Sequence, residues 1–459
     1  MIFPAYKDYK NSEIEWLNSA PVHWVKVPIK YMALEKNSLF LDGDWIESKD
    51  LSTNGIRYIT TGNVGEGQYK EQGLGYISDE KFHQINCTEV FEGDLLISRL
   101  NSPIGRSCIV PDLNSRIVTS VDNVIFRPDH RYSKKFLVYL FTSQDYFNHT
   151  GNLARGATMQ RISRGVLGNI RVIVPPVEEQ EQIANFLGHE TAKINTLIDK
   201  QQQLIKLLKE KRQAVISHAV TKGLNPDAPM KNSGVEWFGE VPEHWRLIKF
   251  GHISCVVRGG SPRPAGDPTL FNGDYSPWVT VAEITKDDEI YLTKTETCLT
   301  KKGSDQCRVF SKGTLLLSNS GATLGVPKIL DLDANANDGV VGFEALDGSV
   351  NIEFAYFYLS TLTEYLRESI KQGSGQPNLN TDIVKDLLMP LAPKNEQDLI
   401  VSEVGRVISK YKALLEKAEA FVSLIKERRT ALISAAVTGK IDVRNWQPEH
   451  SEPRMDATA

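Results

Sequence analysis

The stretch Pro175-Pro176-Val177-Glu178-Glu179-Gln180-Glu181-Gln182-Ile183 opens a segment that continues, almost without glycine or proline, to Lys222-Gly223. Apolar residues recur in this segment in steps of three, four and seven, which places them on one face of an α-helix and fits a heptad seam. The apolar seam residues are Ile194, Ile198, Ile205, Leu208, Val215 and Ala219, and polar Gln201 and Arg212 fill two further seam positions. The pattern predicts one long helix.

A second copy of this segment lies 217 residues further along the chain (Lys209 to Lys426, 426−209). It opens with Pro393-Lys394-Asn395-Glu396-Gln397-Asp398-Leu399-Ile400 and runs to Lys440. Its seam residues keep the same register at Tyr411, Leu415, Val422, Ile425, Leu432 and Ala436. A helix whose copy lies in the same chain is expected to pair with it internally rather than with another chain.

Shorter sequence motifs also repeat at the start of each half. Lys10-Asn11-Ser12, Glu15-Trp16 and Pro21-Val22-His23-Trp24 return as Lys231-Asn232-Ser233, Glu236-Trp237 and Pro242-Glu243-His244-Trp245, an offset of 221 (245−24). In the middle of each half, Gly93-Asp94-Leu95-Leu96-Ile97-Ser98 returns as Gly313-Thr314-Leu315-Leu316-Leu317-Ser318. An internal repeat of about half the chain predicts two similar halves.

Each half combines short strands and turns with a long helix, so we expect an α+β fold of two mixed α/β domains and two long helices. Aromatic and aliphatic residues at helical spacing predict core helices at 136–147 and 354–365. The expected boundaries are a leader at 1–21, a first domain at 22–177, a long helix at 178–223, a linker with the repeated leader at 224–242, a second domain at 243–394, a long helix at 395–445, and a flexible tail at 446–459.

Composition narrows the class of protein. The chain is 41% hydrophobic and 24% charged, and it has no apolar run approaching the roughly 20 residues that span a bilayer. Residues 1–8 lack the basic and apolar regions of an export signal. Its five cysteines include no Cys-x-x-Cys pair, which is typical of reduced thiols. We expect a cytoplasmic protein with no membrane contact and no bound metal.

The net charge of −4 by itself argues against a nucleic-acid binder, but the charge is unevenly distributed. Between Arg99 and Arg171 the chain carries eleven Lys or Arg residues against four Asp, an excess of seven positive charges (11−4). Such a stretch predicts one face that attracts anions. The corresponding stretch from Asn319 to Leu388 carries four basic residues against ten acidic ones, so the second half does not repeat it.

Catalytic motifs are missing. Gly439-Lys440 is followed by Ile441 and lacks the upstream glycine of a phosphate-binding loop. The nine histidines include no His-x-x-x-His pair or neighbouring nucleophile, and no acidic cluster forms a recognisable metal site. We therefore expect a chain that is not an enzyme and binds no cofactor itself.

What remains is binding, because DNA is read mainly by Arg, Lys, Asn and Gln side chains that pair with base edges and phosphates. Loops in both halves supply these residue types. The candidates are Arg99, Asn101, Arg155, Gln160, Arg161 and Arg164 in the first half, and Arg258, Arg263, Thr280, Asn319, Lys371, Gln376 and Asn378 in the second. The alternative interpretation is that these residues belong to ordinary polar surface loops.

The combination of Glu-Trp, Pro-x-His-Trp, Gly-Asp/Thr-Leu-Leu-x-Ser and Pro-x-x-x-Glu-Gln-x-x-Ile, in the same order twice, resembles the specificity subunit of type I restriction-modification systems. The resemblance covers nearly the whole chain. It implies two target recognition domains that each read half of an asymmetric bipartite site in double-stranded DNA. It also implies that the two long helices pair as an antiparallel coiled coil with pseudo-twofold symmetry and separate the domains. At 1.5 Å per residue, a helix of about 40 residues is about 60 Å long.

The resemblance further implies partners. Methyltransferase subunits and restriction or translocase subunits would dock on the helices and carry S-adenosylmethionine, ATP and Mg. The candidate docking residues are Gln180, Gln201, Lys209, Arg212, Gln397, Lys426 and Arg429. Met159 and Pro377 interrupt the Gly-Thr-Gln type of loop that is usual in this family. Three alternatives remain open: a subunit of a methyltransferase-only or other defence complex, a scaffold that binds only protein, and a nuclease hidden in one half.

Overall fold

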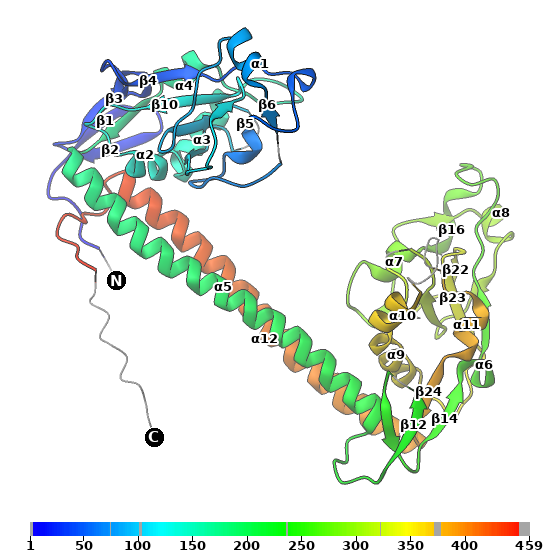
Figure 1. Cartoon of the computed structure of the whole chain (residues 1–459). Coiled ribbons are helices and arrows are strands. Elements are labelled where there is room, and N and C mark those ends of the chain that lie inside the picture. Colours follow the sequence, from blue (N-terminus) through cyan, green and yellow to red (C-terminus); the bar gives the residue numbers. More distant parts are fainter. Residues whose placement is uncertain are drawn as a thin grey trace, which may run out of the picture. The chain divides into compact units, whose positions relative to one another are not determined.

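The computed structural model describes residues 3–448 except 74, 101–102, 236, 322 and 371–377. The chain divides into two compact units: unit 1 comprises Met1–Gln202 and Ala420–Ala459, and unit 2 comprises Gln203–Glu419. There are two long helices, α5 (Val177–Lys222) and α12 (Lys394–Val437) (Figure 1). One part of each helix belongs to unit 1 and the other part belongs to unit 2. Both predicted long helices are therefore confirmed.

Unit 1 is built on the four-stranded antiparallel sheet β4-β10-β7-β8, whose central strand β7 is buried at every residue. A second sheet, β6-β5-β9, and two strand pairs, β11-β3 and β1-β2, surround it. The elements are β1 (Tyr9–Ile14), β2 (Leu17–Pro21), β3 (Val25–Pro28), η1 (Ile29–Met32), β4 (Leu39–Asp42), η2 (Ser48–Asp50), β5 (Ile56–Ile59), η3 (Thr61–Asn63), β6 (Tyr76–Ile77), α1 (Asp79–Gln84), β7 (Leu95–Ser98), β8 (Ser107–Ile109), β9 (Ile117–Thr119), β10 (Asn123–Arg127), α2 (Lys134–Leu140), α3 (Gln144–Leu153), α4 (Arg164–Asn169) and β11 (Arg171–Val174).

Unit 2 repeats this plan with the sheet β15-β23-β20-β21-β17, in which β20 is the buried counterpart of β7. The sheet β18-β16-β22-β19 and the pairs β14-β24 and β12-β13 complete it. The elements are β12 (Met230–Val235), β13 (Gly239–Pro242), β14 (Arg246–Lys249), α6 (Phe250–Ile253), β15 (Cys255–Arg258), β16 (Phe271–Val279), α7 (Val281–Thr285), β17 (Tyr291–Leu292), β18 (Cys298–Leu299), α8 (Lys301–Ser304), β19 (Val309–Phe310), β20 (Leu315–Ser318), β21 (Pro327–Leu330), β22 (Ala334–Ala336), β23 (Val340–Glu344), α9 (Ile352–Thr361), α10 (Thr363–Ile370), α11 (Thr381–Asp386) and β24 (Leu388–Leu391).

The long helices pair within each unit through the predicted seam. Every apolar seam residue is buried or half-buried, because the seam faces the partner helix. In unit 1 the pairing is antiparallel: Gln182 bonds to the carbonyl oxygens of Val443 and Trp446, beyond the end of α12, whereas Asn195, further along α5, bonds to Arg429, which lies eight residues (437−429) before that end. The core of unit 1 joins Phe186 of α5 to residues of α12 and to the domain.

The repeated motifs of the sequence attach each domain to a long helix through a set of side-chain contacts, called the clamp below. In unit 1, Glu179 accepts hydrogen bonds from the Tyr6 hydroxyl (2.6 Å) and the Trp24 indole (3.0 Å) and pairs with the His23 ring (2.7 Å). In unit 2, His244 pairs with Glu396 at 2.9 Å. The Pro-x-His-Trp and Glu-Gln motifs are thus two sides of one contact.

The neighbouring glutamine completes this clamp. Gln180 is 1% exposed; its Oε1 accepts from the backbone N–H of Ser133, and its Nε2 donates to the carbonyls of Pro175 and Arg131. Gln397 is fully buried and makes the same set of bonds with Asn351, Ala392 and Ser349. Because a buried amide is costly without partners, these two residues fix the angle at which each long helix leaves its domain.

Several predicted boundaries were wrong in detail. The second long helix ends at Val437 rather than 445, because Gly439 adopts a positive φ of 73° and ends it. The predicted core helices are each interrupted, near Ser143 and Leu362. The leader at 1–21 and much of 224–242 form the hairpins β1-β2 and β12-β13.

Residue 446, the first residue of the expected flexible tail, is packed. The Trp446 ring lies 5.3 Å from that of Phe186, at a T-shaped angle, and the Trp446 carbonyl accepts a hydrogen bond from Gln182. Trp446 therefore belongs to the packed part of unit 1. Residues 449–459 of the predicted tail lie outside the described residues.

Candidate nucleic-acid interface

A short exposed loop at 155–161 is the centre of the candidate interface in unit 1. The backbones of Arg155 and Arg161 exchange two N–H···O bonds of 2.9 Å each, which close the loop at its base. Gly156 has a φ of 117°, and a Cβ there would lie 2.2 Å from the Met159 carbonyl oxygen, so the loop requires glycine. The side chains of Met159 and Gln160 are exposed at its tip.

Four arginines gather around the base of this loop. Arg99, Arg155 and Arg161 line a hollow of about 420 Å³, and Arg164 lies beside it at the start of α4. Burial lowers the pKa of Arg99; Asp42 counteracts this, and the nearby Arg161 and Arg164 guanidinium groups lower the pKa further. The positive charges are thus close enough to repel one another.

Two carboxylates hold the arginines in place without neutralising all of them. Asp42 lies 3.1 Å from Arg99 Nε and 3.7 Å from Arg164 Nε, and Asp122 lies 2.9 Å from Arg161 Nη2. Four cations against two anions leave a surplus of two positive charges at an exposed loop. Such a cluster can bind phosphate oxygens while the loop tip approaches a groove of DNA.

The two arginines Arg99 and Arg161 have different tasks in this cluster. Arg99 is only 4% exposed and donates to the carbonyl oxygens of Ile162 (3.1 Å) and Val121 (2.5 Å). The side chain of Arg161 is 50% exposed. Arg99 therefore holds the loop in position from inside the domain, which does not fit the expectation of a direct DNA contact, and Arg155 and Arg161 face outward.

The expected surplus of seven positive charges between Arg99 and Arg171 is not a surface property. Arg116 pairs with Glu89 and Asp79, and Arg127 pairs with Asp94, which are all acids outside the counted stretch, whereas Arg131 pairs with Asp129 inside it. The count along this stretch therefore omitted Asp79, Glu89 and Asp94. At the loop, the cationic surface consists of the cluster described above.

The equivalent edge of unit 2 has a different chemistry. Asn319 occupies the place of Arg99 after the central strand and is fully buried, and Ser320 and Asn378 form the backbone bridge that Leu100 and Arg161 form in unit 1. Arg258 ends the strand that corresponds to β4, is exposed, and donates to the Asp338 carbonyl at 2.6 Å.

The other candidates of unit 2 are spread along its loops. Arg263 is exposed, with its backbone N–H bound to Gln306, and the Thr280 hydroxyl caps α7. Lys371 and Gln376 lie outside the described residues, as does Asn101 of unit 1. Among the described candidates of unit 2, Arg258 and Asn378 are therefore the exposed residues that lie at the edge equivalent to the loop of unit 1.

The candidate docking residues of the helices divide into two groups. Gln180 and Gln397 are buried in the clamps described above, so their side chains are not available to a partner, which corrects the expectation for these two. Gln201, Lys209, Arg212, Lys426 and Arg429 are exposed or half-buried. Each long helix also exposes large apolar side chains at matching positions 217 residues apart: Leu197, Leu204 and Leu207 on α5, and Leu414, Phe421 and Leu424 on α12.

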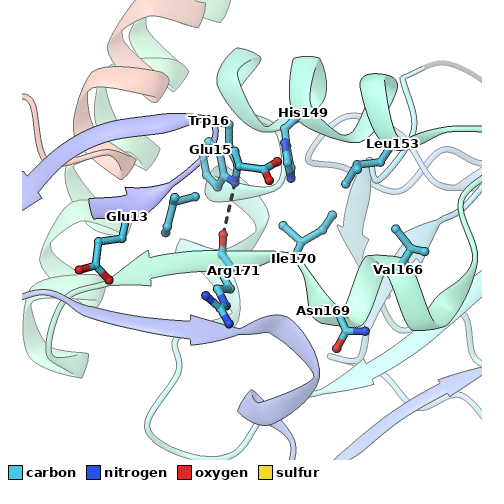
Figure 2. A pocket seen from close by; sticks show the side chains of 10 residues that line it. Glu13, Glu15, Trp16, His149, Leu153, Val166, Asn169, Ile170 and Arg171 are labelled. Carbon is cyan, nitrogen blue, oxygen red and sulfur yellow. Dashed lines mark hydrogen bonds between the residues drawn. The ribbon is translucent and has the colours of Figure 1, made fainter. Parts of the chain in front are cut away.

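The Glu-Trp motif lies beside a separate hollow of unit 1, of about 380 Å³ (Figure 2). The Trp16 ring stacks on His149 at 6.0 Å, and its indole N–H donates to the Arg171 carbonyl at 3.3 Å. Burial lowers the pKa of His149, so this ring is neutral at pH 7. Trp16 thereby fastens the hairpin β1-β2 to α3 and β11, as Trp237 packs on Tyr365 in unit 2.

Within the part of the chain that the structure describes, no group of three His, Cys, Asp or Glu side chains could hold a metal ion. In the same residues, no helix has the length and apolarity needed to cross a bilayer.

The family model for the type I restriction modification DNA specificity domain matches residues 24–207 and again 242–419. The chain belongs to the type I restriction modification DNA specificity family. The two matches begin at Trp24 and at Pro242, so each match to this specificity protein includes the clamp tryptophan, the clamp glutamate and the start of one long helix.

Relatives of this specificity protein are found in archaea and bacteria. It is 24% identical over 388 residues to a putative type I restriction enzyme MjaX specificity subunit of Methanocaldococcus jannaschii, covering 81% of this chain and 84% of the relative. It is 21% identical over 337 residues to the type I restriction enzyme EcoKI specificity subunit of Escherichia coli, covering 72% and 70%.

Solved structures share the fold of this specificity protein. A structure described as the basis of complex assembly and conformational transition of the type I R-M system has a TM-score of 0.71 at 17% identity, covering 92% of this chain and 99% of that one. The HsdS subunit of Thermoanaerobacter tengcongensis has a TM-score of 0.52 at 18% identity, covering 92% and 98%. The predicted family and its tandem α+β architecture are confirmed.

Sequence reasoning missed Asp42, the acid that pairs with both Arg99 and Arg164. Asp42 ends β4, far along the chain from these arginines, and no local signal marks it because strand pairing brings it to the loop. Asp122 was counted within the stretch, but its pairing with Arg161 was not predicted. The role of Glu179 and Glu396 could have been found, since each repeats with its His-Trp partner.

Proposed function

We propose that this specificity protein reads an asymmetric bipartite site in double-stranded DNA, with the loop at 155–161 as the reading loop of unit 1. The arginine cluster at that loop carries the proposal. Arg155 and Arg161 are exposed and oriented, and Asp42 and Asp122 leave them a surplus of positive charge. Gln160 at the tip offers the paired donor and acceptor that can read an adenine edge.

The chain acts in this proposal as a cytoplasmic, non-catalytic recognition subunit. Methyltransferase subunits, and restriction or translocase subunits where present, would bind S-adenosylmethionine, ATP and Mg and perform the chemistry. The exposed apolar residues on α5 and α12 support docking on the helices, because exposed leucines at matching helical positions are typical of partner-binding faces. Lys209, Lys426 and the other exposed helix candidates would form the polar border of that surface.

Methylome sequencing of cells that express the chain with its methyltransferase tests the two-reader proposal. The expected result is one modified motif made of two specific parts separated by a fixed number of unspecified bases. A continuous motif, or no motif despite an intact complex, would contradict it.

Exchange of residues 22–174 for the corresponding domain of a relative tests modularity. The exchange leaves the clamp residues of α5 in place, so the complex is expected to assemble and only one half of the motif to change. A change in both halves would contradict the assignment of one half-site to each unit.

A further inference from the structure

Each unit has a groove between its recognition domain and its pair of long-helix segments. In unit 1 the groove is lined by α5 and α12 positions that include Asn195, Ile198, Lys426 and Arg429. In unit 2 the lining includes Lys412, Leu415, Lys209 and Arg212, which are the same positions 217 residues apart. The two grooves are therefore copies of one structural feature.

In unit 2 this groove receives an acidic loop of the chain itself, Asp287-Asp288-Glu289. Glu289 Oε1 lies 2.9 Å from Lys412 Nζ on α12, and Asp288 Oδ2 lies 3.7 Å from Arg212 Nη2 on α5. Asp287 pairs at 2.5 Å with Lys328, whose side chain is 1% exposed. Two ion pairs thus connect the loop to the two helices, and the third, with Lys328 of β21, fastens it to the recognition domain.

In unit 1 the corresponding loop is Glu66-Gly67-Gln68. Both loops follow a threonine-capped turn of helix, at Thr60 and Thr280, and both bond to the strand after the central one, through Gly67 to Ser107 and through Ile290 to Ile329. This loop has one acidic residue, Glu66, against three in the loop of unit 2, and among the described residues no ion pair joins Glu66 to α5 or α12.

The groove of unit 1 is accordingly more open, at about 830 Å³ against about 460 Å³ in unit 2. The side-chain ammonium groups of Lys135 and Lys426, both exposed, make no ion pair or hydrogen bond with any described residue, and Arg429 donates one bond, of 2.8 Å, to the neutral side chain of Asn195. Glu66 and Asp199 also line the groove, so three cations face two carboxylates.

We infer that the groove of unit 1 receives an acidic peptide segment of a partner subunit, in the place that Asp287–Glu289 fills within unit 2. The partner is a protein rather than a nucleic acid because the occupant of the equivalent groove is a peptide. Carboxylates held between a domain and two helices match the guanidinium of Arg429 and the ammonium groups of Lys135 and Lys426 in charge and reach. This inference rests on the proposed function, which supplies the partner subunits.

A photocrosslinking amino acid in place of Gln68, on the rim of the groove, tests this inference in the complex purified from co-expression with the methyltransferase subunit. The matched control carries the same amino acid in place of Gln84, an exposed glutamine at the end of α1 and outside the groove. The expected result is a crosslink from position 68, and none from 84, to a partner segment with several Asp or Glu residues. A crosslink to DNA, to a neutral or basic segment, or to no partner at all would overturn it.

Charge reversal gives the second arm. Lys135→Glu with Lys426→Glu is expected to weaken partner affinity about tenfold, and Lys193→Glu, on α5 outside the groove, less than twofold. Equal effects of both would overturn the inference, as would no loss in the double variant. Circular dichroism checks that the variants fold. Failure of any complex to form would instead count against the proposed function, so the two failures are distinguishable.

Discussion

The edge of the recognition domain that bears the loop differs between the two units, although the strands beneath are the same. Asp42 in β4 pairs with Val124, and Arg258 in the corresponding strand β15 pairs with Val341, at matching positions of the repeat. Unit 1 therefore places a carboxylate where unit 2 places a guanidinium. At the position after the central strand the difference in charge is the reverse: unit 1 has the cationic Arg99, and unit 2 has the neutral Asn319.

This exchange shows what the fold fixes and what it leaves free. The buried glutamines Gln180 and Gln397 and the central strands recur almost unchanged, whereas the loop edge changes its charges at equivalent backbone positions. Two domains that share a scaffold but differ at this edge present different hydrogen-bonding groups to DNA. Different half-sites are the expected consequence, and four experiments test how far the equivalence extends.

The largest effect is expected at the buried glutamines. Gln180→Ala and Gln397→Ala should each destabilise their own unit by about 3 kcal/mol, because three hydrogen bonds are lost and buried backbone groups are left without partners. Hydrogen exchange at the amides of Ser133 and Asn351, which donate to these side chains, measures each unit separately. Losses that differ by more than about 1 kcal/mol would contradict the equivalence of the clamps.

Substitution of the neighbouring glutamates is expected to destabilise the two units by different amounts. Glu179 is 8% exposed and has three side-chain partners, whereas Glu396 is paired only with His244 among the described residues, and the Trp245 indole has no partner there. Glu179→Ala is expected to cost about 2–3 kcal/mol and Glu396→Ala about 1 kcal/mol. Urea unfolding followed by tryptophan fluorescence would show this, and the reverse order would contradict it.

At the reading loops, Arg161→Ala should weaken DNA binding by about 1 kcal/mol and reduce the slope of log affinity against log salt by about 1, because one phosphate-contacting cation is lost. Asn378→Ala, at the equivalent bridge of unit 2, should leave the slope unchanged. Titrations of the assembled complex at several salt concentrations give both values. An unchanged slope for Arg161→Ala would place the DNA contact elsewhere in unit 1.

The smallest expected effect is the loss of stability of the acidic loop Asp287–Glu289 at low pH. The hydrogen bond from Lys328 holds the pKa of Asp287 below that of an unfolded aspartate, about 3.9. The pair therefore stabilises the acidic loop above about pH 4, and that contribution is lost as the pH falls through the lower, folded pKa. Hydrogen exchange in residues 286–291 should quicken below pH 4 more than exchange in residues 65–70. Equal acceleration would contradict a role for the ion pairs.

The sequence predicted the elements that depend on local pattern and repetition. The seam from Ile194 to Ala219 was correct because heptad spacing directly reports which side of a helix is buried. The end of α12 was placed eight residues too far (445−437), since a lone glycine at 439 is a weak stop signal against a continuing polar segment.

The interface was predicted less completely, because charge along a chain does not report charge on a surface. Arg155, Gln160 and Arg161 were found by residue type and lie together at an exposed loop. The partners that neutralise Arg116 and Arg127 come from helix α1 and from the loop between α1 and β7, so only the folded domain shows them. The acidic loop Asp287–Glu289 was not predicted, because its partners on the helices lie more than seventy positions away in the chain.

The division of unit 1 into two separate chain segments has a consequence for its synthesis. Residues 1–202 leave the ribosome long before residues 420–459, and the 217 residues between them (419−202) belong to unit 2. At roughly 5–20 residues per second, the nascent unit 1 waits about 10–40 s for the strip of α12 that covers Ile183 and Phe186. Unit 2 is complete first. The N-terminal domain is therefore expected to be the one that chaperones hold during translation, and truncation near residue 419 should expose its apolar helix face while leaving unit 2 folded.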